Sequence, residues 1–266
     1  LAERLNRREC TGGTDIAVIR LPHLSNFTDF DVLEHLDGVS LRYVENPEEL
    51  GLPDAVILPG TKNTMEDLLW MRQNGLEAAV LKKAAEGKVI FGVCGGYQML
   101  GESLSDPDHV EAGGEIKGMG LLPMHTIFRD SKTRTRVQGR FPQVKGILHT
   151  LTGTELEGYE IHMGESILSE GAEPFTEITD TVKMESKTDG AACSNVYGSY
   201  VHGIFDKEEV AKKIVEALGE AKGMDVSQMT SVDFAQFKET QYDKLADGLR
   251  KHLDMKKIYE ILEQGI

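Results

Sequence analysis

The sequence predicts an α/β fold in which a mostly parallel sheet carries helices on both faces. From residue 15 to about residue 104, short apolar runs of strand length alternate with segments of helical spacing, which is the pattern of parallel strands joined by helices. The chain has 266 residues, of which 40% are hydrophobic, and this suffices for the core of one large domain with a small appendage.

Charge and cysteine content exclude several classes of function. The formal net charge of −15 argues against a surface for nucleic acid or anionic membranes. No apolar run approaches the roughly 20 residues of a membrane span. The cysteines Cys10, Cys94 and Cys193 are widely spaced and form no Cys-x-x-Cys pair, so we expect no disulfide framework and no metal site. This cysteine usage favours a reducing, cytoplasmic location.

The expected elements follow one another in a regular order. Strands are expected at 16–21, 39–44, 55–58 and 88–93, and helices at 27–36, 64–74, 76–86 and 96–104. Between residues 105 and 200, Gly, Asp and Ser separate β-like runs near 120–128, 134–139, 156–163 and 192–201. These runs indicate additional, partly antiparallel strands.

The two ends of the chain differ from this middle region. Residues 1–14 are polar and basic, and we interpret them as a linker from a missing upstream domain because the chain starts at Leu1. Residues 15–210 are expected to form the catalytic domain. Residues 211–266 are expected to form a C-terminal helical extension, which begins within a helix at 206–218. The tail at 231–264 is charged and carries apolar residues at helical spacing, which predicts a docked helical appendage: Leu245, Leu249, Leu253, Ile258 and Leu262.

The turn after residues 89–93 carries most of the chemical information. Gly92, Cys94 and Gly96 form a Gly-x-Cys-x-Gly turn between an apolar run and a helical segment. This is the nucleophile-elbow pattern with cysteine in place of serine. Glycines are needed there because a side chain would collide with the neighbouring strand or helix. The turn places the sulfur at the carboxyl edge of the sheet, and the following helix favours the reactive thiolate.

Acyl transfer at this cysteine also requires donors for a developing oxyanion. The backbone N–H of Gly95 is one candidate. The other is expected at the end of the preceding strand, at Gly60 or Thr61, where glycine permits close approach of the backbone. Asn63, with Glu66 three residues later, is the expected N-cap of the next helix.

A cysteine nucleophile needs a base, and two of the eight histidines are candidates. His202 ends a strand within a glycine-bounded run and precedes a helix. His162 is the alternative, and it shares one face of a strand with Glu160. Such a pair can indicate a metal site, but two ligands without a third are weak evidence for metal.

Together these segments resemble the class I glutamine amidotransferases of the cobyric acid synthase and cobyrinic acid a,c-diamide synthase type, with the cobyric acid synthase branch the closer match. The resemblance covers about residues 15–210 and rests on these segments: 27–31, 41–44, 58–64, 92–101, 158–164 and 200–206. It implies a flavodoxin-like glutaminase fold in which Cys94 is the nucleophile and His202 its base.

The same resemblance implies roles for other residues. Gly60 or Thr61 would form the oxyanion hole together with Gly95. Gln98 matches a position that helps to hold glutamine in related enzymes. Arg136 is a candidate for binding the substrate carboxylate, a solvated arginine being the alternative.

One position departs from the pattern of many class I glutaminases. Those enzymes carry His-x-Glu, in which the glutamate orients the histidine, whereas Ile204 occupies that place here. The resembled family shows the same loss, so a Cys–His pair is implied. Asp206, Glu160 and His162 are the candidates for orienting His202.

The resemblance also implies partners beyond glutamine. ATP and Mg²⁺ would bind an upstream synthetase domain, and the ammonia would amidate corrinoid carboxylates in cobalamin biosynthesis. The chain has no Gly-x-x-x-x-Gly-Lys-Ser/Thr motif, so we expect no cofactor in this part. Two other functions fit some of the same features: a glutaminase subunit for amidation of lipid II, and a non-catalytic corrinoid-binding module with Cys94 buried.

Overall fold

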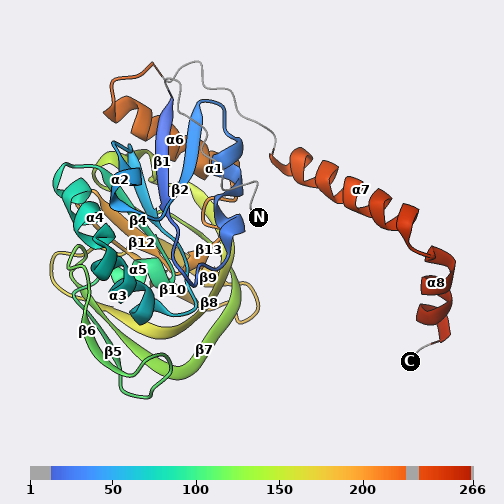
Figure 1. Ribbon diagram of the computed structural model, residues 1–266, viewed down its shortest axis with the longest axis horizontal. Helices are drawn as coiled ribbons and strands as arrows, with labels where there is room; N and C mark the ends of the chain where they lie inside the picture. Colours follow the sequence, from blue (N-terminus) through green and yellow to red (C-terminus); the bar gives the residue numbers. More distant parts are fainter. Residues whose placement is uncertain (1–12, 226–233, 265–266) are drawn as a thin grey trace. The chain divides into compact units, whose positions relative to one another are not determined.

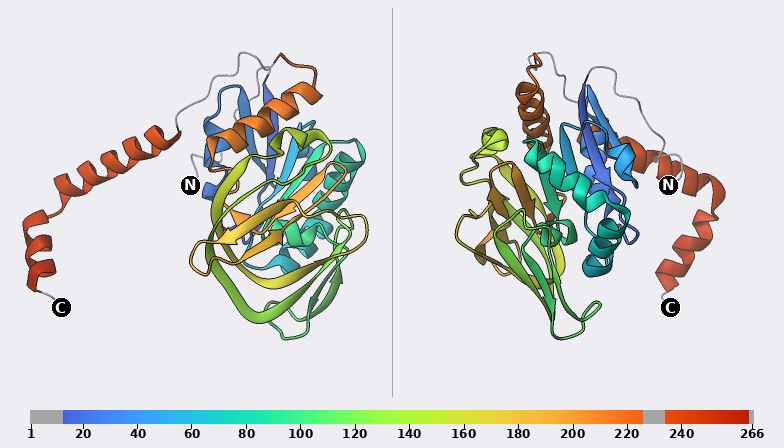
Figure 2. Two further views of the ribbon diagram at one scale, coloured as in Figure 1. Left: turned by 180° about the vertical axis from the view of Figure 1, so that it is seen from behind. Right: turned by 60° about the vertical axis from the view of Figure 1, so that its left-hand side comes forward.

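The computed structural model of the chain describes residues 13–225 and 234–264. It divides into two compact units, Leu1–Thr230 and Ser231–Ile266. The first unit contains two sheets and most of the helices (Figures 1 and 2). The second unit contains α7 (Phe234–His252) and α8 (Met255–Gln264), which carry four of the five apolar positions expected for the tail, while Leu253 lies between the two helices.

The first sheet has the strand order β11-β12-β4-β3-β1-β2. Five of its strands are parallel, and only β11 runs against its neighbour. The bounds are β1 Thr14–Ile19, β2 Val39–Val44, β3 Ala55–Leu58, β4 Val89–Val93, β11 Ala191–Cys193 and β12 Val196–Ser199. β3 and β4 are buried throughout, as expected for parallel strands that are covered on both faces.

Helices on both faces of this sheet confirm the predicted fold class. The chain moves one way from β1 to β2 and the other way from β2 through β3 to β4, so right-handed crossovers place the connecting helices on opposite faces. α1 (Asp31–His35) packs against α6 (Glu208–Ala221), whereas α2 (Pro47–Leu50) and α3 (Thr64–Asn74) pack against α4 (Leu76–Ala85). The strand order reverses between β1 and β3, and ligands bind at such a switch point, beyond the carboxyl ends of the strands.

The second sheet lies beside the first and is largely antiparallel (Figure 2). β7 (Met124–Arg140) and β8 (Glu155–Leu168) form its central ribbon, with an irregularity in register between Ile127 and Lys132. The other strands are β5 Ser103–Asp106, β6 Gly114–Lys117, β9 Thr176–Asp180, β10 Ser186–Asp189 and β13 Val201–His202. Two short 3₁₀ segments complete the elements, η1 Phe27–Phe30 and η2 Ile147–Leu151.

The structure corrects several predicted boundaries. The helix expected at 96–104 is only α5 (Gly95–Met99), after which the chain turns into β5. Leu100 and Leu104 are both fully buried, and their spacing fits a helix as well as a turn followed by a strand. The run expected at 134–139 and residues 124–128 of the run expected at 120–128 belong to one strand, β7. The boundary expected after residue 210 falls inside α6, and the linker expected at 1–14 lies almost wholly outside the described residues.

Candidate active site

Cys94 stands at the turn between β4 and α5 in a backbone conformation that few non-glycine residues adopt, with φ 51° and ψ −110°. A Cβ added at Gly96 would lie 2.0 Å from the carbonyl oxygen of Leu58, and one at Gly92 would lie 2.6 Å from the amide nitrogen of Tyr97. The expected reason for both glycines therefore holds, since only glycine allows the strand and helix to approach so closely. Cys94 is 7% exposed and lines a cavity of about 300 Å³.

His202 lines the same cavity, and it is held by the carboxylate of Asp29, which lies 173 positions earlier in the sequence. Its Nδ1 lies 2.7 Å from Oδ2 of Asp29, and the backbone N–H of Gly203 donates to Oδ1 of Asp29 at 3.1 Å. Both side chains are only 2% exposed. Burial lowers the pKa of His202, but hydrogen bonds and charge interactions with Asp29 and Cys94 outweigh it and raise this pKa to about 10. The imidazole therefore carries a proton at neutral pH, and it does so beside the sulfur of Cys94.

Asp29 replaces the three residues that we expected to orient His202. Glu160 instead forms an ion pair with Lys187 at 2.8 Å and lies 3.3 Å from Nε2 of His162. Burial raises the pKa of Glu160, but the contacts with His162 and Lys187 lower it below its usual range.

His162 lines the Cys94 cavity as well, but its ring is held by other partners. The ring of His162 stacks on Tyr200 at 3.8 Å between centroids, and its Nδ1 lies 3.1 Å from the carbonyl oxygen of Gly164. Asp206 lines a second cavity.

The sequence contained one indication that Asp29 belongs to the site. Asp29 lies in the segment 27–31, which follows β1 and therefore starts at the carboxyl edge of the sheet.

The residues expected to form the oxyanion hole lie on two neighbouring loops: Gly95 follows Cys94, and Thr61 lines the Cys94 cavity. A Cβ added at Gly95 would lie 3.2 Å from the backbone nitrogen of Thr61, and one added at Gly60 would lie 2.8 Å from Cε1 of His202. The loop after β3 and the elbow after β4 are therefore in direct contact. Because Gly60 has no side chain, the imidazole of His202 can occupy the space beside it.

A buried carboxylate fixes the loop that carries Thr61. Asp67 is fully buried, accepts from Thr61 Oγ1 at 2.5 Å and lies 2.7 Å from Nδ1 of His23. The hydrogen bond to Asp67 raises the pKa of His23. Backbone hydrogen bonds join the same two segments, from Ser25 to Gly60 and from Lys62 to His23. As expected, Asn63 caps α3 by accepting from the backbone N–H of Glu66.

Gln98 lines the cavity, but its amide is already occupied. Its Oε1 accepts from Thr64 Oγ1 at 3.1 Å, and its Nε2 donates to the carbonyl oxygen of Met163 at 3.1 Å and to the hydroxyl of Tyr200 at 3.2 Å. The side chain is therefore a fixed part of the cavity wall, which restricts the expected contact with substrate.

Arg136 does not line the cavity of Cys94; it lines the second one. Charged side chains that do line the Cys94 cavity are Lys62, Lys132 and Glu111. Glu111 accepts from the backbone N–H of Met65 at 3.0 Å, at the start of α3. Burial raises the pKa of Glu111, and hydrogen bonds from the first turn of α3 only partly offset it. The cavity thus presents both a carboxylate and ammonium groups, a pair suited to an amino acid.

No group of three His, Cys, Asp or Glu side chains within 13–225 and 234–264 is arranged to hold a metal ion. In the same part of the chain, no helix is long and apolar enough to cross a membrane.

Comparisons with known proteins agree with this geometry. A family model described as the CobB/CobQ-like glutamine amidotransferase domain matches residues 15–210. The chain is 51% identical to the cobyric acid synthase of Ruminiclostridium cellulolyticum, covering 100% of this chain and 52% of that protein. It is 50% identical to the cobyric acid synthase of Lachnoclostridium phytofermentans, covering 95% and 51% respectively. The chain therefore spans about half the length of these relatives.

Solved structures confirm the fold alone. The structure of PurLQS from Thermotoga maritima matches 79% of this chain and 99% of its own, with a TM-score of 0.60 and 17% identity. A structure described as a glutamine amidotransferase matches 77% of this chain and 98% of its own, with a TM-score of 0.53 and 18% identity. The predicted class I glutaminase fold is thereby confirmed.

Proposed function

This chain belongs to the CobB/CobQ-like glutamine amidotransferase domains, and we propose that Cys94 and His202 hydrolyse glutamine to supply ammonia for the amidation of corrinoid carboxylates. The observation that carries this proposal is one cavity shared by the sulfur on its strained turn and the imidazole held by Asp29. Nucleophile, base and orienting carboxylate are the parts that acyl transfer requires.

The reaction begins when the Cys94 thiolate attacks the carbon of the glutamine side-chain amide. The backbone N–H groups of Gly95 and of the loop at Gly60 and Thr61 stabilise the oxyanion. Protonated His202 gives its proton to the departing nitrogen, and ammonia leaves a glutamyl thioester. His202, now neutral, takes a proton from water, whose oxygen attacks the thioester and releases glutamate. Asp29 holds the ring in the orientation that both proton transfers need.

The ends of glutamine call for two opposite charges. We assign the α-carboxylate to Lys132 and the α-ammonium to Glu111, because both side chains line the Cys94 cavity. Glu111 is the carboxylate that lines this cavity, and the backbone N–H of Met65 holds it beside the start of α3. This assignment replaces Arg136 as the residue that binds the substrate carboxylate.

The acceptor follows from the relatives, which are named cobyric acid synthases. In this proposal ammonia passes to carboxylates on a corrinoid, and ATP and Mg²⁺ activate those carboxylates in a synthetase domain outside this chain. We further propose a cytoplasmic location, where the nucleophilic thiol stays reduced.

The proposal is tested by glutamate release and by covalent labelling. The chain is incubated with glutamine, or with the electrophilic analogue diazo-oxo-norleucine, and the labelled residue is located by peptide mass. We expect Cys94→Ala to abolish both glutamate release and labelling. Cys193→Ala is the matched control, because Cys193 lies on β11 and does not line the cavity, and it should retain both. Glutamate release that persists in Cys94→Ala would refute the assignment.

A further inference from the structure

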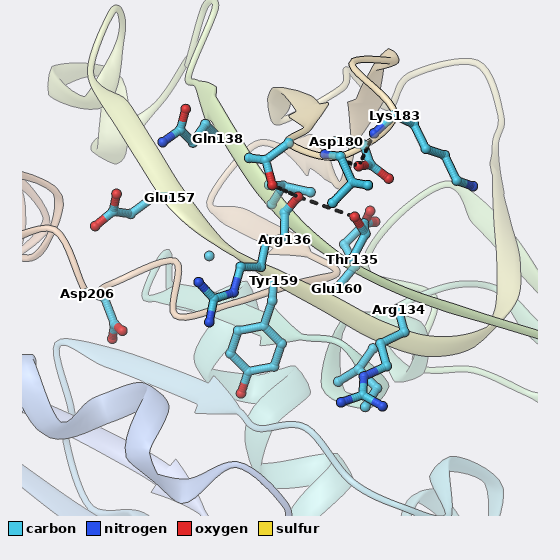
Figure 3. A pocket seen from close by; sticks show the side chains of 15 residues that line it. Arg134, Thr135, Arg136, Gln138, Glu157, Tyr159, Glu160, Asp180, Lys183 and Asp206 are labelled. Carbon is cyan, nitrogen blue, oxygen red and sulfur yellow. Dashed lines mark hydrogen bonds between the residues drawn. The ribbon is translucent and has the colours of Figure 1, made fainter.

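The strand pairing of the second sheet places Tyr159 next to the imidazole of His202. Tyr159 on β8 is the direct partner of His202 on β13, and its partner on β7 is Arg136. Directly paired residues of neighbouring strands project from the same face of a sheet, so these three side chains stand in one row. Figure 3 shows Arg136 and Tyr159 in the wall of the second cavity, which has a volume of about 1030 Å³. In this row Tyr159 lies between Arg136 and His202.

The ring of Tyr159 covers one face of the imidazole. The two ring centroids lie 5.3 Å apart, and the ring planes are inclined by 22°. This is an offset stack, an arrangement that aromatic rings prefer, and the face of an aromatic ring attracts a positive charge at such a distance. The imidazole of His202 carries that charge at neutral pH, because its pKa is raised to about 10. The stack therefore favours the protonated imidazole that the proposed mechanism uses.

The stack also supplies a restraint that the hydrogen bond with Asp29 does not. That bond holds the imidazole of His202 at one atom, Nδ1, at 2.7 Å. Because a hydrogen bond is directional along its own axis, the ring can still tilt about that axis. Such a tilt displaces Nε2, the nitrogen that Asp29 does not hold and that transfers the proton in the proposed mechanism. An aromatic ring packed on one face of the imidazole opposes this tilt.

The hydroxyl of Tyr159 is tied to the segment that supplies Asp29. Nδ2 of Asn26 donates to this hydroxyl at 2.6 Å. Asn26 precedes η1 and has a left-handed backbone, with φ 54° and ψ 42°, a conformation that asparagine tolerates better than most residues. Its carbonyl oxygen accepts from the backbone N–H of Asp29 at 3.0 Å. The side chains of Tyr159 and Asp29 thus reach His202 from two elements, β8 and η1, and Asn26 joins the two.

The phenol of Tyr159 has no direct part in the proposed chemistry. Burial and the negative charge of Asp29 raise its pKa and outweigh the hydrogen bond from Asn26, so the phenol stays neutral beside the imidazole. Tyr159 does not line the Cys94 cavity. It can therefore affect the reaction only through His202.

We propose that Tyr159 is a positioning residue that holds the imidazole of His202 by stacking on it, and that Asn26 holds Tyr159 in place. This inference rests on the proposed function. Removing the aromatic ring frees the imidazole to tilt and slows proton transfer. Removing only the hydroxyl leaves the stack in place and costs less.

The kinetics of glutamate release test this role. We expect Tyr159→Leu to lower kcat about tenfold with KM for glutamine nearly unchanged, since the ring supports His202 and touches no substrate. The alkaline loss of kcat/KM should move to lower pH, because the protonated imidazole has lost its aromatic face. Tyr159→Phe keeps the ring, so its kcat should stay within about threefold of the wild-type value, with the wild-type pH profile.

The matched control is Tyr242→Leu, which makes the same change on α7, where Tyr242 is 60% exposed. It should retain the wild-type kinetics. Thermal unfolding checks the folding of each variant, and Tyr159→Val takes the place of Tyr159→Leu should that variant not fold. A folded variant without the ring that keeps the wild-type kcat and alkaline limb would overturn the stacking role. A loss in Tyr159→Phe as large as that in Tyr159→Leu would overturn it as well.

A double-mutant cycle tests the part of Asn26. Asn26→Gly keeps the left-handed backbone and removes the amide that donates to Tyr159. Once residue 26 is glycine, Tyr159→Phe should cause no further loss of kcat, because the bond it removes is already absent. Losses of kcat that multiply in the double variant would refute the link between Asn26 and Tyr159.

The charge of the imidazole can also be followed without catalysis. An NMR titration of His202 should give a lower pKa in Tyr159→Leu than in the wild type, and an unchanged pKa in Tyr159→Phe. An unchanged pKa in Tyr159→Leu would contradict the stack. Absence of glutamate release by the wild-type chain would instead count against the proposed function, and the titration would still test the stack.

Discussion

Replacing Asp29 with asparagine removes the carboxylate that holds His202. Asp29 serves two donors, Nδ1 of His202 at 2.7 Å and the backbone N–H of Gly203 at 3.1 Å. Asparagine offers one accepting oxygen and one donating nitrogen, so it cannot serve both. If its amide donates to Nδ1, the ring proton moves to Nε2, which is the nitrogen left for Cys94. The neutral imidazole then cannot accept the thiol proton.

The size of the effect follows from burial. With both side chains 2% exposed, water does not replace the lost bond. A charge-assisted hydrogen bond of this kind contributes about 1.5–3 kcal/mol, or about 10- to 150-fold in rate. The wrong tautomer adds to that loss, and the matching substitution in a Ser–His–Asp triad costs about 10⁴. We therefore expect kcat/KM for glutamine to fall by about 10²–10⁴ in Asp29→Asn.

The pH dependence should move as well. In the wild type, the proton on His202 is retained until pH approaches its pKa of about 10, and the proposed mechanism needs this protonated ring as the proton donor. Without the negative charge of Asp29 this pKa falls, so the alkaline loss of kcat/KM should occur at lower pH. The stability of the folded chain depends on pH in the same direction. Because the pKa of His202 is raised in the folded state, its protonation contributes fully to stability below the ordinary pKa of histidine, and this contribution is lost as pH rises toward 10.

The assay is the initial rate of glutamate release from neutral to alkaline pH, with thermal unfolding as the check of folding. Asp31→Asn makes the same chemical change two residues along, on α1, and serves as the control. A folded Asp29→Asn protein that keeps the wild-type kcat/KM and the wild-type alkaline limb would refute the orienting role.

Three further substitutions have distinct expected results in the same assay. Gly60→Ala places a Cβ 2.8 Å from Cε1 of His202, so the ring must shift and kcat should fall by about 10²; an unchanged kcat would contradict the close approach. Glu111→Gln should raise KM for glutamine about tenfold with little change in kcat, and a loss confined to kcat would argue against contact with the α-ammonium. Asp67→Asn weakens the bond that holds Thr61, so kcat should fall about tenfold at nearly constant KM; a change in KM alone would show that the loop does not serve the oxyanion.

The parallel sheet could be predicted from the sequence because its strands are short apolar runs with clear ends. The same pattern could not predict β5, β6 or β10, whose residues are largely polar. Those strands exist because they pair with neighbours in the second sheet, and pairing partners far apart in sequence leave no local signal. The helix predicted at 96–104 was too long for the same reason, because its last residues belong to β5 although their spacing also fits a helix.

The site could be predicted where its chemistry is local and not where it depends on packing. Glycines flank Cys94 within five residues, and His202 ends a glycine-bounded run, so both stood out in the sequence. Asp29 lies 173 positions from His202, and only the fold brings them together. Arg136 was a candidate for the substrate carboxylate but lines the second cavity, whereas Lys132 lines the Cys94 cavity, because the cavity that a side chain lines depends on its position along the ribbon.

The position of Asp29 also accounts for the loss of the usual glutamate two residues after the histidine. Ile204 fills that position with an aliphatic side chain, which offers the ring no carboxylate. In the first sheet β1 lies beside β3, and β3 lies beside β4. The segments after these three adjacent strands supply Asp29, the oxyanion loop and Cys94, all at one edge. A carboxylate that follows β1 therefore reaches the imidazole. The order Asp–Cys–His along the chain can supply the same three groups, because such a constellation depends on geometry and not on sequence order.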